Sequence, residues 1–476
     1  MKSLVVLLLS LFVLSINNLK AQDSLTIKKG TVTDSLIDPI TGSKFSVYLP
    51  TEYNKSKKWP LLIGLESSVK SSSIAYIFKE AAEEYGYIVA ILSCDQNNTF
   101  DQSSKQFVEF INTITSFFSV QDDAIYSVGI GNDADLSSLM PVLYPDYFAG
   151  TIAINNSVIY DETFKPKKNF FYYGLVHTGR VEFRHFMWIR NFLTERAIPA
   201  EVLVYNTQSE IPSTRVMKQV LSKFSLQAML KGGRALDSLW IQKELKEDLL
   251  LLSDFFEKEE YLKAKQKIIQ IKQNYYGYYP KDSIQEIESK ILSSRNFKKE
   301  ETEFFSALNQ EDLLTNNYMN LLKKDIENVD YESLSWWEDE IKKLNEINKN
   351  GDRYVKDGDR YVKDMVVRVK IFIKNILKDY KEELKNSKID SKIFLNILSV
   401  IIDQKDFDSY IDIIKLSVLD GDYETTLFYL EKLLNNGYND YERLYQIEGT
   451  LGIRITKEYN DIVKKYFGRS KYQVYH

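Results

Sequence analysis

Two patterns of hydrophobic and polar residues divide this chain. In the first, which runs to about residue 231, short apolar runs alternate with amphipathic stretches. The apolar runs predict strands over 44–49, 60–64, 88–93, 124–128, 151–154, 170–176 and 201–206, and the amphipathic stretches predict helices over 74–85, 102–118, 133–143, 183–196 and 215–230. Because the strand interiors are apolar throughout rather than alternating, we expect a mainly parallel sheet with helices on both faces.

From residue 236 onward the apolar residues recur with the period of a helix. This pattern predicts helices over 236–257, 260–274, 283–292, 311–328, 332–348, 365–384, 392–403, 407–419, 423–435 and 457–467. Of the nine prolines only Pro280 lies in this half, so long helices can form. Gly232-Gly233 is a natural helix stop. We therefore predict an α/β domain over 24–233, followed by an all-α domain over 234–476 arranged as a helical solenoid.

Residues 1–21 have the pattern of a secretory signal peptide. Lys2 gives a positive start, residues 4–16 are apolar apart from serines, and Ala21 is a small residue at a suitable cleavage site. A buried N-terminal helix is the alternative. No later stretch has the roughly 18 consecutive apolar residues that a membrane helix needs. We therefore expect an exported protein, periplasmic or extracellular, with no membrane span in the mature chain.

The composition excludes several classes of function. There are 62 Lys and Arg residues against 67 Asp and Glu, so no excess of positive charge favours nucleic acid. Cys94 is the only cysteine and cannot form an intramolecular disulfide, and three histidines are too few for a dedicated metal site. We expect neither a metal nor a cofactor.

Three segments of the first half carry a resemblance to a known family. Residues 45–50 (FSVYLP), with 59–63 (WPLLI), form one; residues 125–133 (IYSVGIGND) and 143–150 (LYPDYFAG) are the others. They resemble, in this order, the opening strands, the nucleophile elbow and the end of the elbow helix in the α/β-hydrolase fold. The resemblance is to secreted esterases of the polyhydroxybutyrate depolymerase and feruloyl esterase kind, and it covers residues 44–231.

This resemblance implies a serine nucleophile at the elbow, and the sequence departs from it there. The elbow needs the pattern G-x-S-x-G, in which a strained turn presents the serine between two glycines. The five positions here are residues 129–133 (GIGND). Gly129 is kept, Gly131 stands at the nucleophile position without a side chain, and Asp133 replaces the outer glycine.

The other catalytic positions that the resemblance implies are also substituted. Ser209 stands where the histidine belongs, residues 177–180 (HTGR) stand in place of the acid, and Glu66-Ser67 replace the His-Gly pair near the oxyanion hole. Loss of nucleophile, base and acid together leaves no reaction through a triad. The sequence therefore predicts a pseudo-hydrolase.

A relocated catalytic pair, Ser67 with His177, is the alternative, because both follow strands whose carboxyl ends share one edge of the sheet. The plainer interpretation makes His177 a packed loop residue and His185 a helix-surface residue. Asp133 and Asp135 are interpreted as charges at the start of a helix, where carboxylates are favoured, rather than as metal ligands.

The helical half carries a second resemblance. Residues 421–434 (GDYETTLFYLEKLL) resemble the turn and second helix of a tetratricopeptide repeat, with Thr426 where alanine is usual. Residues 259–268 are a weaker match that keeps the alanine, Ala264, and no regular 34-residue period joins the two. We predict degenerate helical repeats that bind a protein or peptide partner.

Two further features of this half have plain explanations. The chain has 32 tyrosines, including Tyr275, Tyr276, Tyr278 and Tyr279 at one predicted helix end, and these suit either an interface or half-buried helix packing. Residues 351–364 repeat the heptad GDRYVKD, which we interpret as a local duplication in a loop or helix end rather than a ligand site.

Three functions therefore compete. The first is an exported binding or scaffold protein with an inactive esterase-like domain and partner-binding helical repeats. The second is an esterase-like serine hydrolase whose catalytic residues have moved. The third is a carbohydrate or peptide site in the former catalytic cleft. A hydrolase needs a nucleophile within hydrogen-bond reach of a base, whereas a binding protein needs only a shaped surface.

Overall fold

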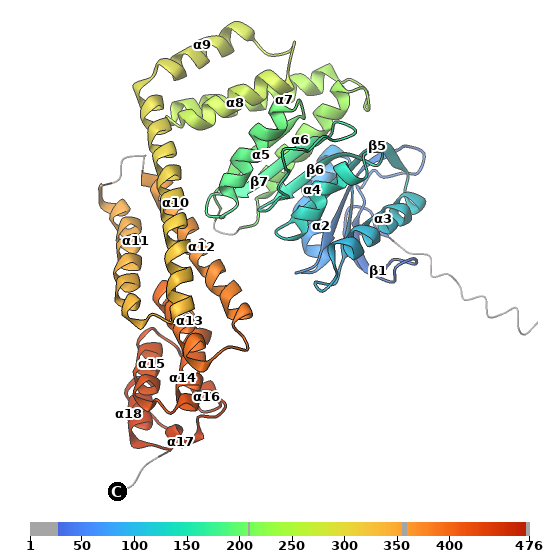
Figure 1. Ribbon diagram of the computed structural model, residues 1–476. Helices are drawn as coiled ribbons and strands as arrows, with labels where there is room; N and C mark the ends of the chain where they lie inside the picture. Colours follow the sequence, from blue (N-terminus) through green and yellow to red (C-terminus); the bar gives the residue numbers. More distant parts are fainter. Residues whose placement is uncertain (1–26, 208–209, 355–358, 473–476) are drawn as a thin grey trace, which may run out of the picture. The chain divides into compact units, whose positions relative to one another are not determined.

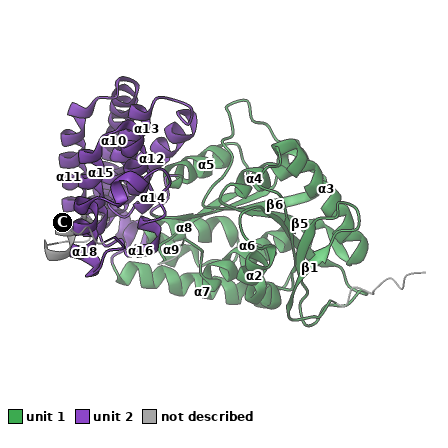
Figure 2. Ribbon diagram, turned by 90° about the horizontal axis from the view of Figure 1, so that it is seen from below, with its two compact units in different colours: residues 1–178, 182–258, 263–286 green, residues 179–181, 259–262, 287–476 purple. Residues whose placement is uncertain are grey.

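The computed structural model describes residues 27–207, 210–354 and 359–472 (Figure 1). The chain forms two compact units (Figure 2). The sheet unit contains residues up to 178, 182–258 and 263–286, and the helical unit contains residues 179–181, 259–262 and those from 287 onward. The predicted signal peptide lies outside the described residues. No described helix is both long enough and apolar enough to cross a membrane.

An eight-stranded sheet forms the centre of the sheet unit. Its strands are β1 (Val32–Ile37), β2 (Lys44–Tyr48), β3 (Trp59–Glu66), β4 (Ile88–Ser93), β5 (Val120–Ile130), β6 (Phe148–Ile154), β7 (Phe171–His177) and β8 (Ala200–Tyr205). The spatial order is β1-β2-β4-β3-β5-β6-β7-β8. β2 pairs antiparallel with β1 and β4, and every later neighbour is parallel. The carboxyl ends of β3 to β8 therefore meet at one edge.

Helices cover both faces of this sheet and create two apolar cores. One core contains side chains from α2 (Ser71–Tyr85) and α6 (Thr214–Leu230). The other contains side chains from α3 (Phe100–Phe117) and α4 (Asp133–Leu143), and α5 (Phe183–Glu195) packs on β7 and β8. The predicted mostly parallel sheet with helices on both faces is confirmed.

The sheet unit continues beyond residue 233, where the sequence analysis set its end, and reaches residue 286. It includes α7 (Ser238–Glu257) and most of α8 (Tyr261–Asn274). The physical reason is a buried polar network. Lys223 of α6 donates to Asp248 of α7 and, at 2.8 Å, to the hydroxyl of Tyr275, the residue that follows α8.

The helical unit is all-α, as predicted. Its elements, with α9 leading into it, are α9 (Lys281–Ser293), α10 (Arg295–Asn328), a 3-10 turn η1 (Tyr331–Ser333), α11 (Leu334–Tyr354), α12 (Asp359–Glu383), α13 (Ile389–Ile402), α14 (Phe407–Asp420), α15 (Tyr423–Asn435), α16 (Tyr441–Leu444), α17 (Leu451–Arg454) and α18 (Lys457–Phe467). α10 begins 16 residues earlier than the 311–328 prediction, because residues 295–310 are too polar to reveal a helical period.

The segment that resembles a tetratricopeptide repeat forms a helix–turn–helix. Gly421 ends α14 with a φ of 81°, and the side chain of Asp422 accepts a hydrogen bond from the Thr425 N–H to cap α15. Thr426 is fully buried where α14 packs on α15. The two copies of the duplicated heptad lie at the end of α11 and the start of α12, apart from residues 355–358, which lie outside the described part.

Candidate functional site

The turn between β5 and α4 keeps the backbone shape that a nucleophile elbow requires. Gly131 lies in the left-handed region with a φ of 57°, and its N–H donates to the Ile154 carbonyl at 2.9 Å. A Cβ on Gly129 would lie 2.4 Å from the Asp133 carbonyl oxygen, so only glycine fits there. A Cβ on Gly131 would meet no atom within 4 Å. The turn has room for a nucleophile but carries no side chain to act as one.

A carboxylate occupies the last position of this elbow. Asp133 Oδ2 accepts hydrogen bonds from the Ser67 N–H at 2.9 Å and from the Ser67 hydroxyl at 3.0 Å. Burial raises the pKa of Asp133, the Ser67 bonds oppose that rise, and the nearby charge of Glu66 adds to it. The start of α4 and the loop after β3 are thus joined by a carboxylate in place of a glycine.

A second carboxylate fixes the same loop. Glu66 is almost fully buried, and its Oε1 accepts from the N–H and hydroxyl of Ser68 and from the Val69 N–H, all within 2.8 Å. Glu66 and Ser67 stand where the resemblance implies the His-Gly pair near an oxyanion hole. Because Asp133 and Glu66 already accept the N–H groups of residues 67–69, this loop presents negative charge where a hydrolase would stabilise a developing anion.

The proposed substitute pair is not brought together at this edge. β5 and β6 separate β3, which leads to Ser67, from β7, which ends at His177, so about three strand spacings of roughly 4.8 Å lie between them. The Ser67 hydroxyl donates to Asp133, while His177 Nε2 lies 3.0 Å from the Thr207 carbonyl. Ser209 lies outside the described residues.

The remaining candidates are also poorly placed for chemistry. Burial, with the charges of Asp133 and Glu66, raises the pKa of Cys94 to about 12, which keeps this thiol protonated. His185, expected on a helix surface, is half-buried, with Nε2 3.1 Å from the Val158 carbonyl and burial lowering its pKa. Burial raises the pKa of Asp135 despite a bond from Asn156.

One residue that organises this edge, Asn155, was not predicted from the sequence. It follows β6 with a φ of 60°, a conformation that asparagine tolerates better than most residues. Its Oδ1 accepts from the His177 N–H and the Tyr205 hydroxyl, both at 2.9 Å, and its Nδ2 donates to the Glu210 carbonyl. Asn155 therefore connects the ends of β6, β7 and β8. An asparagine directly after an apolar strand was the available signal.

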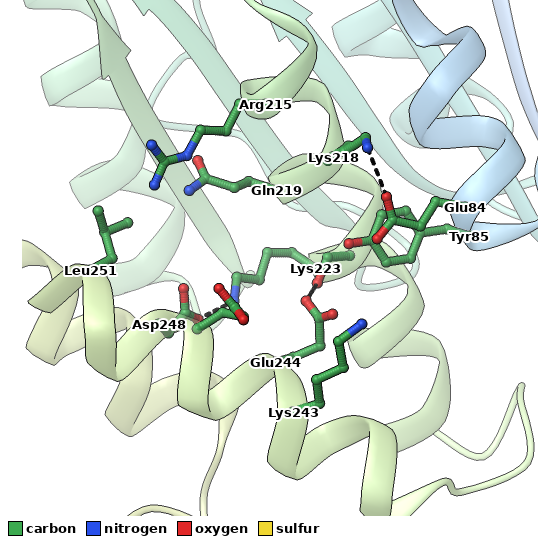
Figure 3. Close-up of a pocket in the computed structure, with 12 residues that line it drawn as sticks. Glu84, Tyr85, Arg215, Lys218, Gln219, Lys223, Lys243, Glu244, Asp248 and Leu251 are labelled. Carbon is green, nitrogen blue, oxygen red and sulfur yellow. Dashed lines mark hydrogen bonds and ion pairs between the residues drawn. The ribbon is translucent and has the colours of Figure 1, made fainter.

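A second candidate site lies among helices. A pocket of about 270 Å³ opens between α2, α6 and α7 (Figure 3). All its lining side chains come from these three helices: Glu84, Tyr85, Arg215, Lys218, Gln219, Ser222, Lys223, Lys243, Glu244, Glu247, Asp248 and Leu251. None belongs to the carboxyl edge of the sheet. The sequence analysis did not identify this pocket, because its walls come from two predicted domains.

The buried polar network lies at this pocket. Asp248 accepts from Lys223, from Lys267 at 3.2 Å and from the Tyr275 hydroxyl at 2.8 Å. Although burial opposes it, the two lysines hold the pKa of Asp248 down, at about 2. Behind them, burial raises the pKa of Glu201, whose Oε2 has no hydrogen-bond partner among the described residues.

Neither site shows the donor set of a metal centre. Within the described residues no group of three or more His, Cys, Asp and Glu side chains is arranged to hold a metal ion.

Comparisons with known proteins add only distant structural likenesses. No protein-family model and no curated protein matches the sequence. Among solved structures, S-formylglutathione hydrolase from Staphylococcus aureus is similar at a TM-score of 0.35 and 10% identity, over 41% of this chain and 98% of that one. A feruloyl esterase module from Clostridium thermocellum gives 0.34 and 13%, over 40% and 85%, and Est1E from Butyrivibrio proteoclasticus gives 0.33 and 10%, over 42% and 99%. Likenesses at this level carry no argument about activity.

Proposed function

We propose that this chain is an exported pseudo-hydrolase that acts as a binding or scaffold protein. The observation that carries the proposal is the elbow, where Gly131 keeps the required backbone turn and has no side chain to attack a substrate. Asp133 and Glu66 support it, because they place carboxylates where a hydrolase needs hydrogen-bond donors for an anion. The leader pattern at residues 1–21 supports export.

The helical unit would supply the partner-binding surface. Several large apolar side chains of this unit are at least 40% exposed: Phe305, Leu313, Met319, Trp336, Leu419, Tyr423, Phe428, Leu451 and Ile455. Exposed aromatic residues are typical of protein interfaces. The degenerate tetratricopeptide-like pair α14–α15 supports a protein or peptide as the partner.

Treatment of the purified chain with a fluorophosphonate probe tests the loss of hydrolase chemistry. We expect no adduct on any serine by intact mass and peptide mapping, with an active serine esterase labelled in parallel as the control. A stoichiometric adduct would overturn the proposal. If it mapped to Ser67 and disappeared in Ser67→Ala and His177→Gln variants, it would establish the alternative, an esterase with relocated catalytic residues.

A further inference from the structure

The pocket between α2, α6 and α7 has two long walls, which carry mainly opposite charge. The α6 wall presents Arg215, Lys218, Gln219, Ser222 and Lys223, whose spacing places them on one helix face. The α7 wall presents Glu244, Glu247, Asp248 and Leu251 on one face, with Lys243 beside them. Figure 3 shows Arg215, Gln219 and Lys223 on the α6 side, and Glu244 and Asp248 on the α7 side.

Part of this charge is satisfied within the protein. Lys223 is bound to Asp248, Ser222 donates to Glu244, and Lys218 pairs with Glu84 of α2 at 3.0 Å. Among the described residues, Arg215 and Glu247 form no ion pair and no side-chain hydrogen bond. Lys243 of α7, which also lines the pocket, likewise forms no ion pair among these residues. Cations on both walls and the Glu247 carboxylate on the α7 wall thus remain available to a ligand in the same cavity.

A ligand that uses both groups must carry both charges. A carboxylate can accept two parallel hydrogen bonds from an arginine and one more from Gln219, and an ammonium can donate to Glu247. Leu251 offers an apolar contact to the carbon atoms between them. The cavity of about 270 Å³ is close to the lower end of the roughly 300–1,000 Å³ that is usual for small-ligand pockets, which suits a small organic molecule.

We propose that this pocket binds a small zwitterion of the amino-acid class. Its carboxylate lies against Arg215 and Gln219, and its ammonium lies against Glu247. Two simpler ligands suit the walls less well. A simple anion would leave Glu247 without a partner, and a simple cation would leave Arg215 without one. This proposal is independent of the proposed function, because it uses neither the elbow nor the helical unit.

Isothermal titration calorimetry on the full mature chain tests the proposal. The probes are the free L-amino acids, each compared with its N-acetyl derivative, which lacks the ammonium, and its amide, which lacks the carboxylate. We expect saturable binding of at least one free amino acid, at least tenfold weaker binding of both derivatives, and no binding of inorganic phosphate. Absence of saturation for every amino acid, or equal affinity for a derivative or phosphate, would overturn the proposal.

Variants locate the binding in this pocket. Arg215→Gln and Glu247→Gln should each weaken the best amino acid at least tenfold, because each removes one charged contact. Lys246→Gln, an exposed change on α7 outside the pocket lining, is the matched control and should change affinity less than twofold. Unchanged affinity in both pocket variants would place the binding elsewhere. Circular dichroism spectra matching the unaltered chain would exclude misfolding as the cause of a loss.

Discussion

The turn between β5 and α4, which contains the elbow-like residues 129–133, and the pocket between α2, α6 and α7 show two opposite ways of arranging polar groups in one unit. At the elbow the backbone keeps a demanding shape, with Gly129 and Gly131 where they are required, while the surrounding carboxylates satisfy the available N–H groups. In the pocket no special backbone is needed, and charged side chains from separate helices converge; within the described part of the chain, Arg215, Lys243 and Glu247 form no ion pair. A constrained backbone shape and unpaired charged side chains therefore occur in different places in this unit.

The largest expected effect comes from removing the charge at the centre of the buried network. Asp248→Asn leaves Lys223 and Lys267 buried without their shared carboxylate. Loss of one partner of a buried ion pair costs about 3–5 kcal/mol in the free energy of unfolding, measurable by urea denaturation. Asp254→Asn on the same helix breaks an exposed pair with Lys258 and should cost about 0.5 kcal/mol or less. Equal losses in the two variants would contradict the structural importance of the network.

The two elbow glycines should differ from one another. Gly129→Ala places a Cβ against the Asp133 backbone and should cost about 2–3 kcal/mol, because neither strand nor helix can move aside freely. Gly131→Ala meets open space and should cost about 1 kcal/mol for its left-handed backbone. Thermal unfolding of both variants measures the difference, and the reverse order would show that the turn has another shape.

Lowering the pH should change the stability that the two sites contribute in opposite directions. The pKa of Asp248 is lowered in the folded state to about 2, so its contribution to stability is complete above the unfolded value of about 3.8. That contribution, on the order of 2 kcal/mol, is lost as pH falls from 4 to 2. Urea denaturation over this range should show the decline in the unaltered chain and a weaker one in Asp248→Asn.

Asp133 at the elbow should respond in the opposite direction. Its pKa is raised, so its ionised form is disfavoured by folding, and its contribution is most favourable below the unfolded value. The free energy of unfolding of Asp133→Asn, measured relative to that of the unaltered chain, should therefore be more favourable at pH 7 than at pH 4. An equal difference in the free energy of unfolding at the two pH values would show that this carboxylate titrates normally.

The smallest effect on stability should come from Arg215→Gln. Arg215 is exposed and forms no ion pair with any residue that the structure describes, so we expect the free energy of unfolding to change by no more than about 0.5 kcal/mol in urea denaturation. The same variant should lose the binding of the zwitterion. A large stability loss would mean that Arg215 holds the helices together, as Asp248 does, and would remove the contrast between these two residues.

Most of the fold could be predicted from the sequence, and the exceptions have physical causes. Continuous apolar runs identified the parallel strands, and β4 and α4 have the predicted ends. β1 was missed, because VTDSLI is half polar and is irregular in its pairing between Thr33 and Leu36. The end of the sheet unit was misplaced, since Gly232-Gly233 does stop α6 but the buried charges of α7 and α8 are invisible to periodicity.

The candidate sites were less predictable. The absence of a serine from residues 129–133 could be seen directly in the sequence, because the G-x-S-x-G pattern that these residues resemble fixes its position. The hydrogen bonds that Asp133 and Glu66 accept from the loop after β3 could not be predicted. The Asp133 bond joins residues far apart in the sequence, and the Glu66 bonds depend on the local conformation of the loop. The pocket could not be predicted either, because in the sequence Arg215 and Glu247 look like ordinary exposed charges on amphipathic helices. Only the tertiary structure shows that both line one cavity.

The position of Tyr275 has a practical consequence for dividing this protein. It is one of four neighbouring tyrosines, yet it is fully buried, and its hydroxyl binds the same carboxylate as Lys223. A fragment cut after residue 233 would keep Lys223 but lose Asp248, Lys267 and Tyr275. The smallest autonomous piece that carries the sheet should instead end near residue 286, and partner searches with the remaining helices should begin from there.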